Sequence, residues 1–77
     1  MNATEKIKLT KNVTLGYNFG TPVIDIATII IEDNKIHVDH AGSRRFIKSL
    51  NTWLNDGTYS IDTVLKVLNQ HNWNLVK

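Results

Sequence analysis

The amino-acid sequence predicts an α+β fold: a small antiparallel sheet of about four strands with two helices packed on one face, in the order β-β-β-α-α-β. Two observations support this prediction. Residues 5–39 are rich in β-branched side chains and alternate between apolar and polar positions, whereas residues 43–72 carry two amphipathic helical patterns. The 77 residues are enough for one domain with a small core, so we expect a single α+β domain over residues 1–77.

The first strand region is expected in residues 5–19, where the apolar side chains fall on alternate positions, as in a half-buried strand. Lys11 interrupts this pattern, and the neighbouring letters TKN fit a tight turn. Two short antiparallel strands and one long strand with a bulge are therefore both consistent with the sequence. The alternating apolar positions are Ile7, Leu9, Val13, Leu15, Tyr17 and Phe19.

Residues 15–22, with the sequence LGYNFGTP, are expected to form a loop because two glycines and a proline punctuate them. The segment carries two aromatic residues, Tyr17 and Phe19. Aromatic side chains in a loop either form a contact surface for a partner or fold back over the core, and the sequence leaves both possibilities open.

Residues 22–39 predict a hairpin, with a strongly β-forming strand at 23–31, turn residues at 32–35 and a return strand at 35–39. The strand at 23–31 is apolar on both faces. Helices can cover only one face of so small a sheet, so the other face predicts burial in a homodimer or against a protein partner. One face carries Ile24, Ile26 and Ile30, and the other carries Val23, Ala27, Ile29 and Ile31.

Residues 43–57 predict the first helix, with Ser43 as its N-cap and Gly57 as a left-handed residue at its C-terminal end. Its apolar side chains cover one arc of the helical wheel, with Trp53 at the margin. The arc consists of Phe46, Ile47, Leu50, Trp53 and Leu54.

Residues 59–72 predict the second helix, with Ser60 as N-cap and Asp62 in the first turn, where the helix dipole favours a carboxylate. Its apolar stripe is Ile61, Val64, Leu65 and Leu68. Residues 72–77 then read as a short final strand, with Trp73 in the core or at its edge.

The last fourteen residues, VLKVLNQHNWNLVK, resemble small bacterial and phage domains that end in a helix followed by the letters GWELV. Asn72 and Asn74 stand in place of the glycine and the glutamate of that pattern. The resemblance implies a helix–strand ending and carries no function.

The composition excludes several kinds of protein. The absence of cysteine rules out disulfides, thiolate metal sites and cysteine nucleophiles. A net charge of +2 argues against a DNA mimic and permits nucleic-acid binding without requiring it. The first ten residues lack the apolar segment of a signal peptide, and the longest apolar run, IATIII, is too short to span a membrane, so we expect a cytoplasmic protein with no membrane contact.

Two arrangements of polar residues could carry chemistry, and neither has the required spacing. His37, Asp39 and His40 do not converge on one ion, because side chains on a strand alternate between its faces. Ser43 lies three residues after His40, close enough to suggest a nucleophile with its base. We expect instead that the Ser43 hydroxyl caps the helix. We therefore predict no catalytic residues, no metal and no cofactor, with His37 and Asp39 on the solvent side of the sheet.

Anion binding at the start of the first helix is the alternative. Its free N–H groups favour an anion, Gly42 allows close approach, and two arginines supply donors that match phosphate oxygens. Arg44 shares a polar stripe with Lys48, Asn51 and Asn55, whereas Arg45 points about 100° away. The candidate anion-binding residues are Gly42, Ser43, Arg44, Arg45 and Lys48.

The function predicted from these observations is non-catalytic binding by a small accessory protein that acts through protein–protein contacts as a homodimer. An excess of lysine over arginine and the abundant isoleucine and asparagine point to an AT-rich bacterial, phage or mobile-element genome. The first alternative is a nucleic-acid-binding protein that uses Arg44, Arg45 and Lys48. The second is a binder of an anionic small molecule such as a nucleotide. Tyr17 and Phe19 are the predicted contacts for a protein partner.

Overall fold

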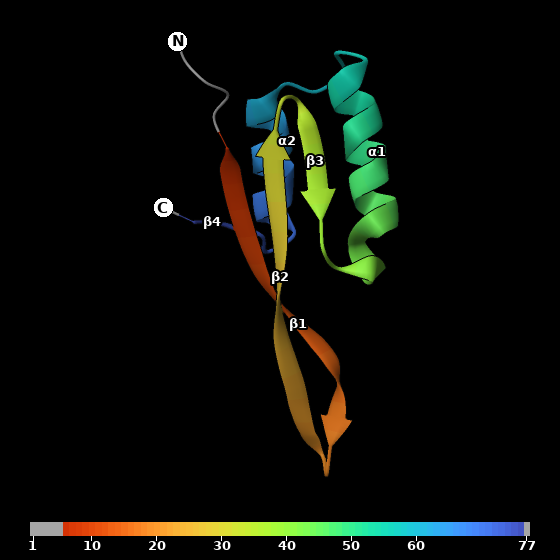
Figure 1. Ribbon diagram of the computed structural model, residues 1–77, viewed down its shortest axis with the longest axis vertical. Helices are drawn as coiled ribbons and strands as arrows, with labels where there is room; N and C mark the ends of the chain where they lie inside the picture. Colours follow the sequence, from red (N-terminus) through yellow and green to blue (C-terminus); the bar gives the residue numbers. More distant parts are fainter. Residues whose placement is uncertain (1–5, 77) are drawn as a thin grey trace.

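The computed structural model describes residues 6–76, which form an α+β fold with one four-stranded antiparallel sheet and two helices (Figure 1). The sheet order is β3-β2-β1-β4, and the order along the chain is β-β-β-α-α-β, as the sequence predicts. Glu5 and Lys77, the expected outer ends of the first and last strands, lie outside the described residues. The elements are β1 Ile7–Asn18, β2 Thr21–Glu32, β3 Lys35–Val38, a short 3-10 helix Ala41–Ser43, α1 Arg44–Asn55, α2 Ile61–Gln70 and β4 Asn74–Leu75.

β1 is one long strand with a bulge, so the alternative of a turn at TKN is wrong. Its register with β2 shifts between Thr14 and Gly16, which places one extra residue in β1. Lys11 lies within the strand, half-buried, and its ammonium lies 5.8 Å from the centre of the Trp73 ring.

The loop expected at residues 15–22 is also wrong, because β1 and β2 continue to within two residues of each other. The connection consists only of Phe19 and Gly20, whose φ angles are 51° and 80°. Two consecutive positive φ values match the twist of the flanking strands and give a tight hairpin turn. A phenylalanine in this left-handed conformation is uncommon. The residues that usually mark such a turn are therefore absent from the sequence, and the hairpin was not predicted.

The predicted hairpin at residues 22–39 is confirmed. The turn between β2 and β3 is Asp33–Asn34, with φ angles of 55° and 60°, the conformation that asparagine and aspartate tolerate best.

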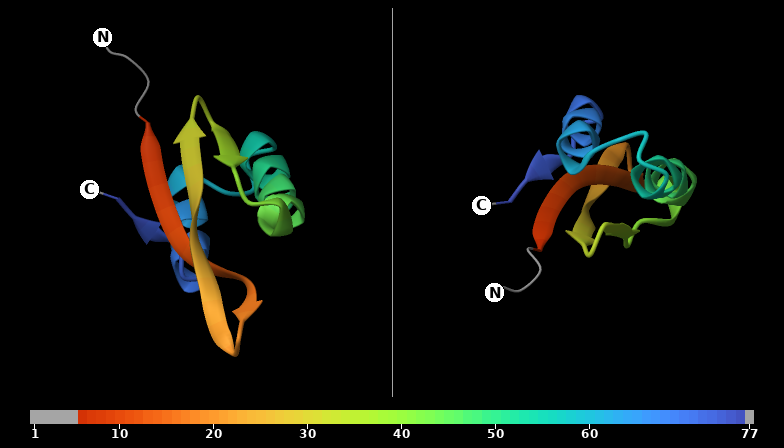
Figure 2. Two further views of the ribbon diagram at one scale, coloured as in Figure 1. Left: turned by 60° about the horizontal axis from the view of Figure 1, so that its bottom comes forward. Right: turned by 90° about the horizontal axis from the view of Figure 1, so that it is seen from above.

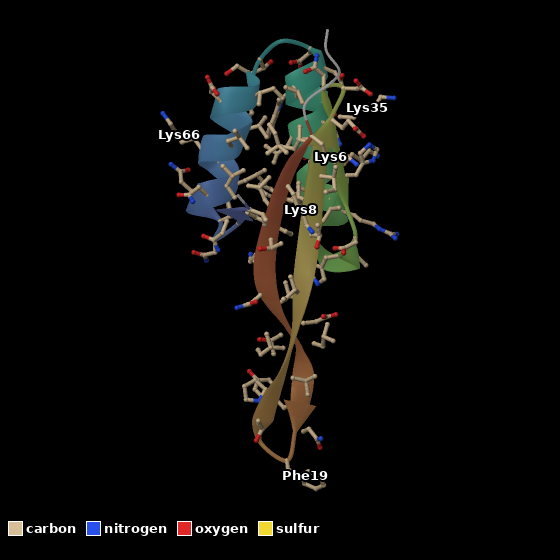
Figure 3. All side chains as sticks on the ribbon, turned by 60° about the vertical axis from the view of Figure 1, so that its left-hand side comes forward. Lys6, Lys8, Phe19, Lys35 and Lys66 are labelled. Atoms are coloured by element: carbon tan, nitrogen blue, oxygen red, sulfur yellow. The ribbon has the colours of Figure 1, made fainter. Side chains whose placement is uncertain are left out.

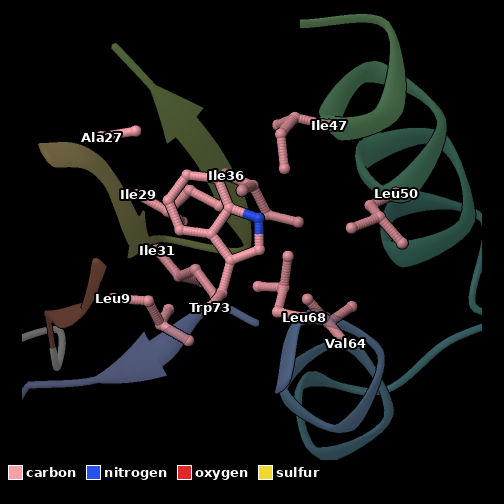
Figure 4. Packing of buried hydrophobic residues seen from close by; sticks show 10 residues of the cluster. All are labelled: Leu9, Ala27, Ile29, Ile31, Ile36, Ile47, Leu50, Val64, Leu68 and Trp73. Carbon is pink, nitrogen blue, oxygen red and sulfur yellow. The ribbon is translucent and has the colours of Figure 1, made fainter. Parts of the chain in front are cut away.

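The core lies between one face of the sheet and both helices, as predicted, with the Trp73 indole at its centre (Figure 4). Trp73 precedes β4 and is almost wholly buried, whereas Leu75 within β4 is half-exposed. Burial of each large apolar side chain contributes about 1.5–3 kcal/mol, so these contacts dominate the stability of so small a chain. The buried residues are Leu9, Ala27, Ile29, Ile31, Ile36, Ile47, Leu50, Val64, Leu68 and Trp73.

The ends of the helices confirm most of the predicted caps. The Ser60 hydroxyl accepts a hydrogen bond from the Thr63 N–H at the start of α2, and Asp62 lies in the first turn. Gly57 has a φ of 85° after the end of α1, as a left-handed C-terminal residue requires. The prediction for Ser43 is wrong in its mechanism: it precedes α1, but its side chain makes no capping bond.

The molecule has extents of 50 × 25 × 18 Å because β1 and β2 run well beyond the rest of the fold (Figures 1 and 2). β4 pairs with β1 only at Leu9 and Thr10, and the β3 ladder ends at Ile29 of β2. We call residues 12–26 the arm and the other described residues the body. No helix in the body or the arm is long and apolar enough to cross a membrane.

Candidate protein-interaction surface

The arm exposes most of the large apolar side chains that lie at the surface. Of nine such side chains among residues 6–76, six are on the arm. Phe19 at the tip is fully exposed, and Tyr17 is 75% exposed. The interpretation that these two aromatics fold back over the core is therefore wrong. The six side chains are Leu15, Tyr17, Phe19, Val23, Ile24 and Ile26.

The bulge decides which face of the arm Tyr17 occupies. Odd-numbered residues of β1 face the core up to Val13, but after the bulge Gly16 pairs with Val23 and Tyr17 pairs with Pro22. Directly paired residues share a face of the sheet. Tyr17 therefore lies on the face opposite the helices, which we call the open face, together with Ile24. The sequence pattern alone places Tyr17 on the core face, and the bulge overrules it.

The open face is less apolar over the body than the sequence predicts. β2 contributes isoleucines there, but their partners on β1 are polar, as in the pairs Lys8–Ile30 and Asn12–Ile26. Ile30 is half-buried, whereas Ile26 and Ile24 are exposed. The apolar surface predicted for the whole of β2 is thus concentrated on the arm.

The arm is almost uncharged. Asp25 is the only charged residue between Asn12 and Ile26. In Figure 3 the labelled lysines all lie on the body, far from Phe19 at the tip. They are Lys6, Lys8, Lys35 and Lys66. The net positive charge of the chain therefore does not repel a partner that approaches the arm.

The exposed apolar side chains gather mainly on one face of the arm and at its tip. Tyr17, Ile24 and Ile26 are each more than half exposed on the open face, and Phe19 is fully exposed at the tip. Clustered exposed apolar side chains mark protein-interaction sites more often than single scattered ones do.

The edge of the sheet at β3 is closed by a side chain of α1. The Asn51 amide accepts a hydrogen bond from the Ile36 N–H at 2.8 Å and donates one to the Ile36 carbonyl at 2.9 Å. Asn51 therefore replaces the strand partner that β3 lacks on this side.

The edge of β2 beyond β3 is closed by two aspartates. The Thr28 N–H donates to the Asp39 carboxylate at 2.7 Å, and the Ile26 N–H donates to the Asp25 carboxylate at 2.8 Å. Charged side chains at an edge oppose pairing with another strand. The predicted solvent position of Asp39 is confirmed, and its role as an edge cap was not predicted.

A shallow groove of about 700 Å³ runs between β3 and α1. Arg44, Lys48 and His37 line it, with Asp56 at one end. The polar stripe predicted on the first helix is confirmed, since Asn51 and Asn55 line the same groove. Arg45 is exposed and lies outside this lining, as its position on the helical wheel predicts.

The start of α1 is more crowded than the sequence indicates. The His40 ring lies over Gly42, where an added Cβ would approach the ring within 2.8 Å. The Ser43 hydroxyl pairs with the His40 Nδ1 at 3.0 Å, so it is not committed to the backbone. The approach to Gly42 expected for an anion is therefore filled by His40. The nearby Asp39 carboxylate accepts a hydrogen bond from the Thr28 N–H.

The described residues offer no metal site and one further cavity. Among residues 6–76, no three metal-ligating side chains come close enough to hold an ion. A second cavity, of about 340 Å³ and mostly apolar, lies between α2 and β4 and is lined by Leu65, Trp73 and Leu75 with their neighbours.

Sequence reasoning found the two aromatics of the arm and an apolar face of β2 that the helices leave uncovered, but it missed Leu15 as a surface residue. The available signal was the long uncharged stretch from Asn12 to Ile26, broken only by Asp25. Together with a two-residue turn, that stretch indicates a ribbon with no covering element.

Comparisons with known proteins bring no relative. No protein-family model matches the chain, and neither a curated protein nor a solved structure is significantly similar to it.

Proposed function

We propose that this protein is a non-catalytic binding protein that acts through protein–protein contacts of its arm, as a homo-oligomer. The observation that carries the proposal is a ribbon with a single charged residue, Asp25, that exposes six large apolar side chains.

The tip supports this proposal through its turn chemistry. A hairpin turn with two positive φ values strongly prefers asparagine or aspartate before glycine, and here Phe19 takes that position. Phenylalanine in a left-handed conformation costs about 1 kcal/mol relative to a residue that tolerates it. Phe19 disfavours its own turn and is fully exposed, so it does not stabilise the fold of the body. This supports a role for Phe19 in contact with a partner.

The test is the molecular mass in solution of the wild type and of a variant with Ile24→Ser and Ile26→Ser. Sedimentation velocity is expected to give an oligomer for the wild type and a monomer for the variant. The oligomer should change little between about 50 and 200 mM salt, because an apolar contact releases few ions. Val76→Ser is the matched control, since Val76 is similarly exposed but lies on the body. A wild type that stays monomeric at high concentration and captures no protein would contradict the proposal.

Anion binding in the groove between β3 and α1 is the second candidate, favoured by the position of Arg44, Lys48 and His37 along one lining. A nucleic acid would be bound with steep salt dependence, whereas a nucleotide would raise the melting temperature. Arg44→Ala with Lys48→Ala should abolish either effect. Arg45→Ala is the matched control because it removes an exposed arginine outside the groove. If both variants lost anion binding equally, the binding would be unspecific charge attraction and not a property of the groove.

A further inference from the structure

We infer that the free edge of β1 in the arm, residues 12–18, pairs antiparallel with the same edge of a second copy and forms a two-fold symmetric dimer. This inference rests on the proposed function and names the partner and the contact surface. It concerns the backbone of β1, whereas the proposed function concerns the apolar side chains of the arm.

The direction of the backbone groups follows from the ladder. Thr28 directs both its N–H and its carbonyl away from β1, because both bond to Asp39. Thr28 lies opposite Thr10, so Thr10 likewise directs its groups outward, on the side of β4. Because outward-facing residues alternate along a strand, Asn12 and Thr14 also present their N–H and carbonyl groups outward.

No strand within residues 6–76 covers these groups. β4 ends its pairing with β1 at Thr10, and the outward side of β1 has no strand neighbour from Asn12 to the tip. Parts of the other edges are closed by side chains: Asn51 bonds to Ile36 of β3, and Asp39 and Asp25 bond to Thr28 and Ile26 of β2. Among residues 6–76, the edge of β1 in the arm has neither a strand nor a charged side chain, and its one irregularity is the bulge between Thr14 and Gly16.

A second copy fits this edge better than a strand of unrelated sequence. Residues 12–18 contain no charge, so two such edges meet without repulsion. Antiparallel pairing of a strand with itself is an isologous contact that closes as a two-fold dimer and leaves no further edge for growth. The capped edge of β2 lies on the other side of the ribbon, which opposes extension of the sheet in that direction.

The geometry also joins the apolar surfaces. A two-fold axis perpendicular to the sheet places the open faces of both copies on the same side. Tyr17 and Ile24 of the two arms then belong to one continuous apolar face, and cross-strand neighbours shield part of each other from water. Edge pairing and the proposed apolar contact therefore act together.

The test removes one outward N–H without adding charge. Thr14→Pro eliminates the donor of an edge residue, a position where proline is tolerated because the N–H faces solvent. Sedimentation velocity is expected to show loss of the dimer for Thr14→Pro. Thr14→Val is the matched control, because it keeps the N–H and a β-branched side chain, and it should remain dimeric.

A second measurement on the wild type keeps the inference falsifiable if the proline variant does not fold. Amide hydrogen exchange of Asn12 and Thr14 should become faster on dilution into the monomeric range, whereas exchange of the core amides should not. Concentration-independent exchange at both residues would overturn the inference.

The outcomes separate this inference from the proposed function. A dimer that persists in Thr14→Pro but is lost with Ile24→Ser and Ile26→Ser overturns edge pairing and leaves the apolar contact standing. A monomeric wild type that binds a strand of another protein, with loss of binding in Thr14→Pro, overturns the second copy as occupant. A wild type that is monomeric and binds no protein overturns both.

Discussion

In the body, β1 and β2 are flanked by β4, β3 and two helices, whereas beyond Val13 the same two strands have no flanking strand or helix among residues 6–76 (Figure 1). The residues differ accordingly. In the body, β1, β2 and β3 have one buried apolar face, and Asn51 and Asp39 close part of the sheet edge. The arm has exposed apolar side chains and a single charge. An isolated two-stranded ribbon is at best marginally stable in water. The contrast teaches that the packed core of the body accounts for stability, whereas the arm exposes apolar side chains that no core covers.

The largest expected difference is between the two most prominent aromatics. Trp73→Ala should lower the free energy of unfolding by about 3–5 kcal/mol, because it removes the side chain at the centre of the core. Phe19→Ala should change it by no more than about 0.5 kcal/mol, because Phe19 is fully exposed. Urea denaturation followed by circular dichroism measures both. If the Phe19 variant lost as much stability as the Trp73 variant, the conclusion that the body accounts for the stability would be wrong.

The fold was largely predictable, and the reason is local. In the body, each predicted element packs against a neighbour, and this burial leaves a pattern in the sequence. The patterns are the alternating apolar residues of the strands, the turn residues before β3 and the apolar arcs of the two helices. The arm was not predictable in the same way, because no neighbour imposes a pattern on it. The bulge at Thr14/Gly16 reverses the faces of β1, and Phe19 occupies a turn position that normally signals itself by asparagine.

The candidate site was predictable only in its side-chain types. The sequence leaves open whether Tyr17 and Phe19 form a contact surface or fold back over the core, because their exposure depends on how far the ribbon leaves the body. At the start of α1, the helical wheel separates Arg44 from Arg45 correctly. The placement of His40 over Gly42 depends on a χ angle that no spacing rule provides.

The second prediction concerns the closed edge of the body. Asn51→Leu should destabilise the fold by about 1–3 kcal/mol, because the half-buried Ile36 N–H and carbonyl lose their partner. Asn55→Leu is the matched control one helical turn later. Its amide bonds only to an exposed helical carbonyl, so its effect should stay within about 0.5 kcal/mol. Equal effects on the urea midpoint would show that the amide of Asn51 does not close the edge.

The third prediction compares the two aspartates that cap β2, one at the body and one on the arm. Asp39→Ala should cost about 1 kcal/mol, because it removes the carboxylate that accepts the hydrogen bond of the Thr28 N–H. Asp25→Ala should cost about 0.5 kcal/mol or less, because water replaces the carboxylate at the exposed Ile26.

The Asp25 variant should instead change self-association. Removing the only charge of the arm frees the Ile26 N–H and opens the β2 edge to pairing, so larger assemblies should appear in light scattering at high concentration. Asp39→Ala retains Asp25 and should associate like the wild type. A reversal of this order would place the edge protection at the body and not on the arm.

The smallest expected effect concerns the turn of the body that follows α1. After α1, the Thr58 hydroxyl and then the Thr58 N–H donate to the Asp56 carboxylate and lower the pKa of Asp56 below its ordinary value. A lowered pKa in the folded state means that the ionised carboxylate adds stability at neutral pH and loses it as the pH falls through the folded pKa. Thr58→Val removes the hydroxyl but keeps the N–H, so the pKa of Asp56 should rise part of the way back. Titration of the Asp56 side-chain carbon by NMR in the wild type and in Thr58→Val measures this. An unchanged Asp56 curve in the variant would assign the lowered pKa to the Thr58 N–H alone, and the hydroxyl would then contribute nothing to the charge of this turn.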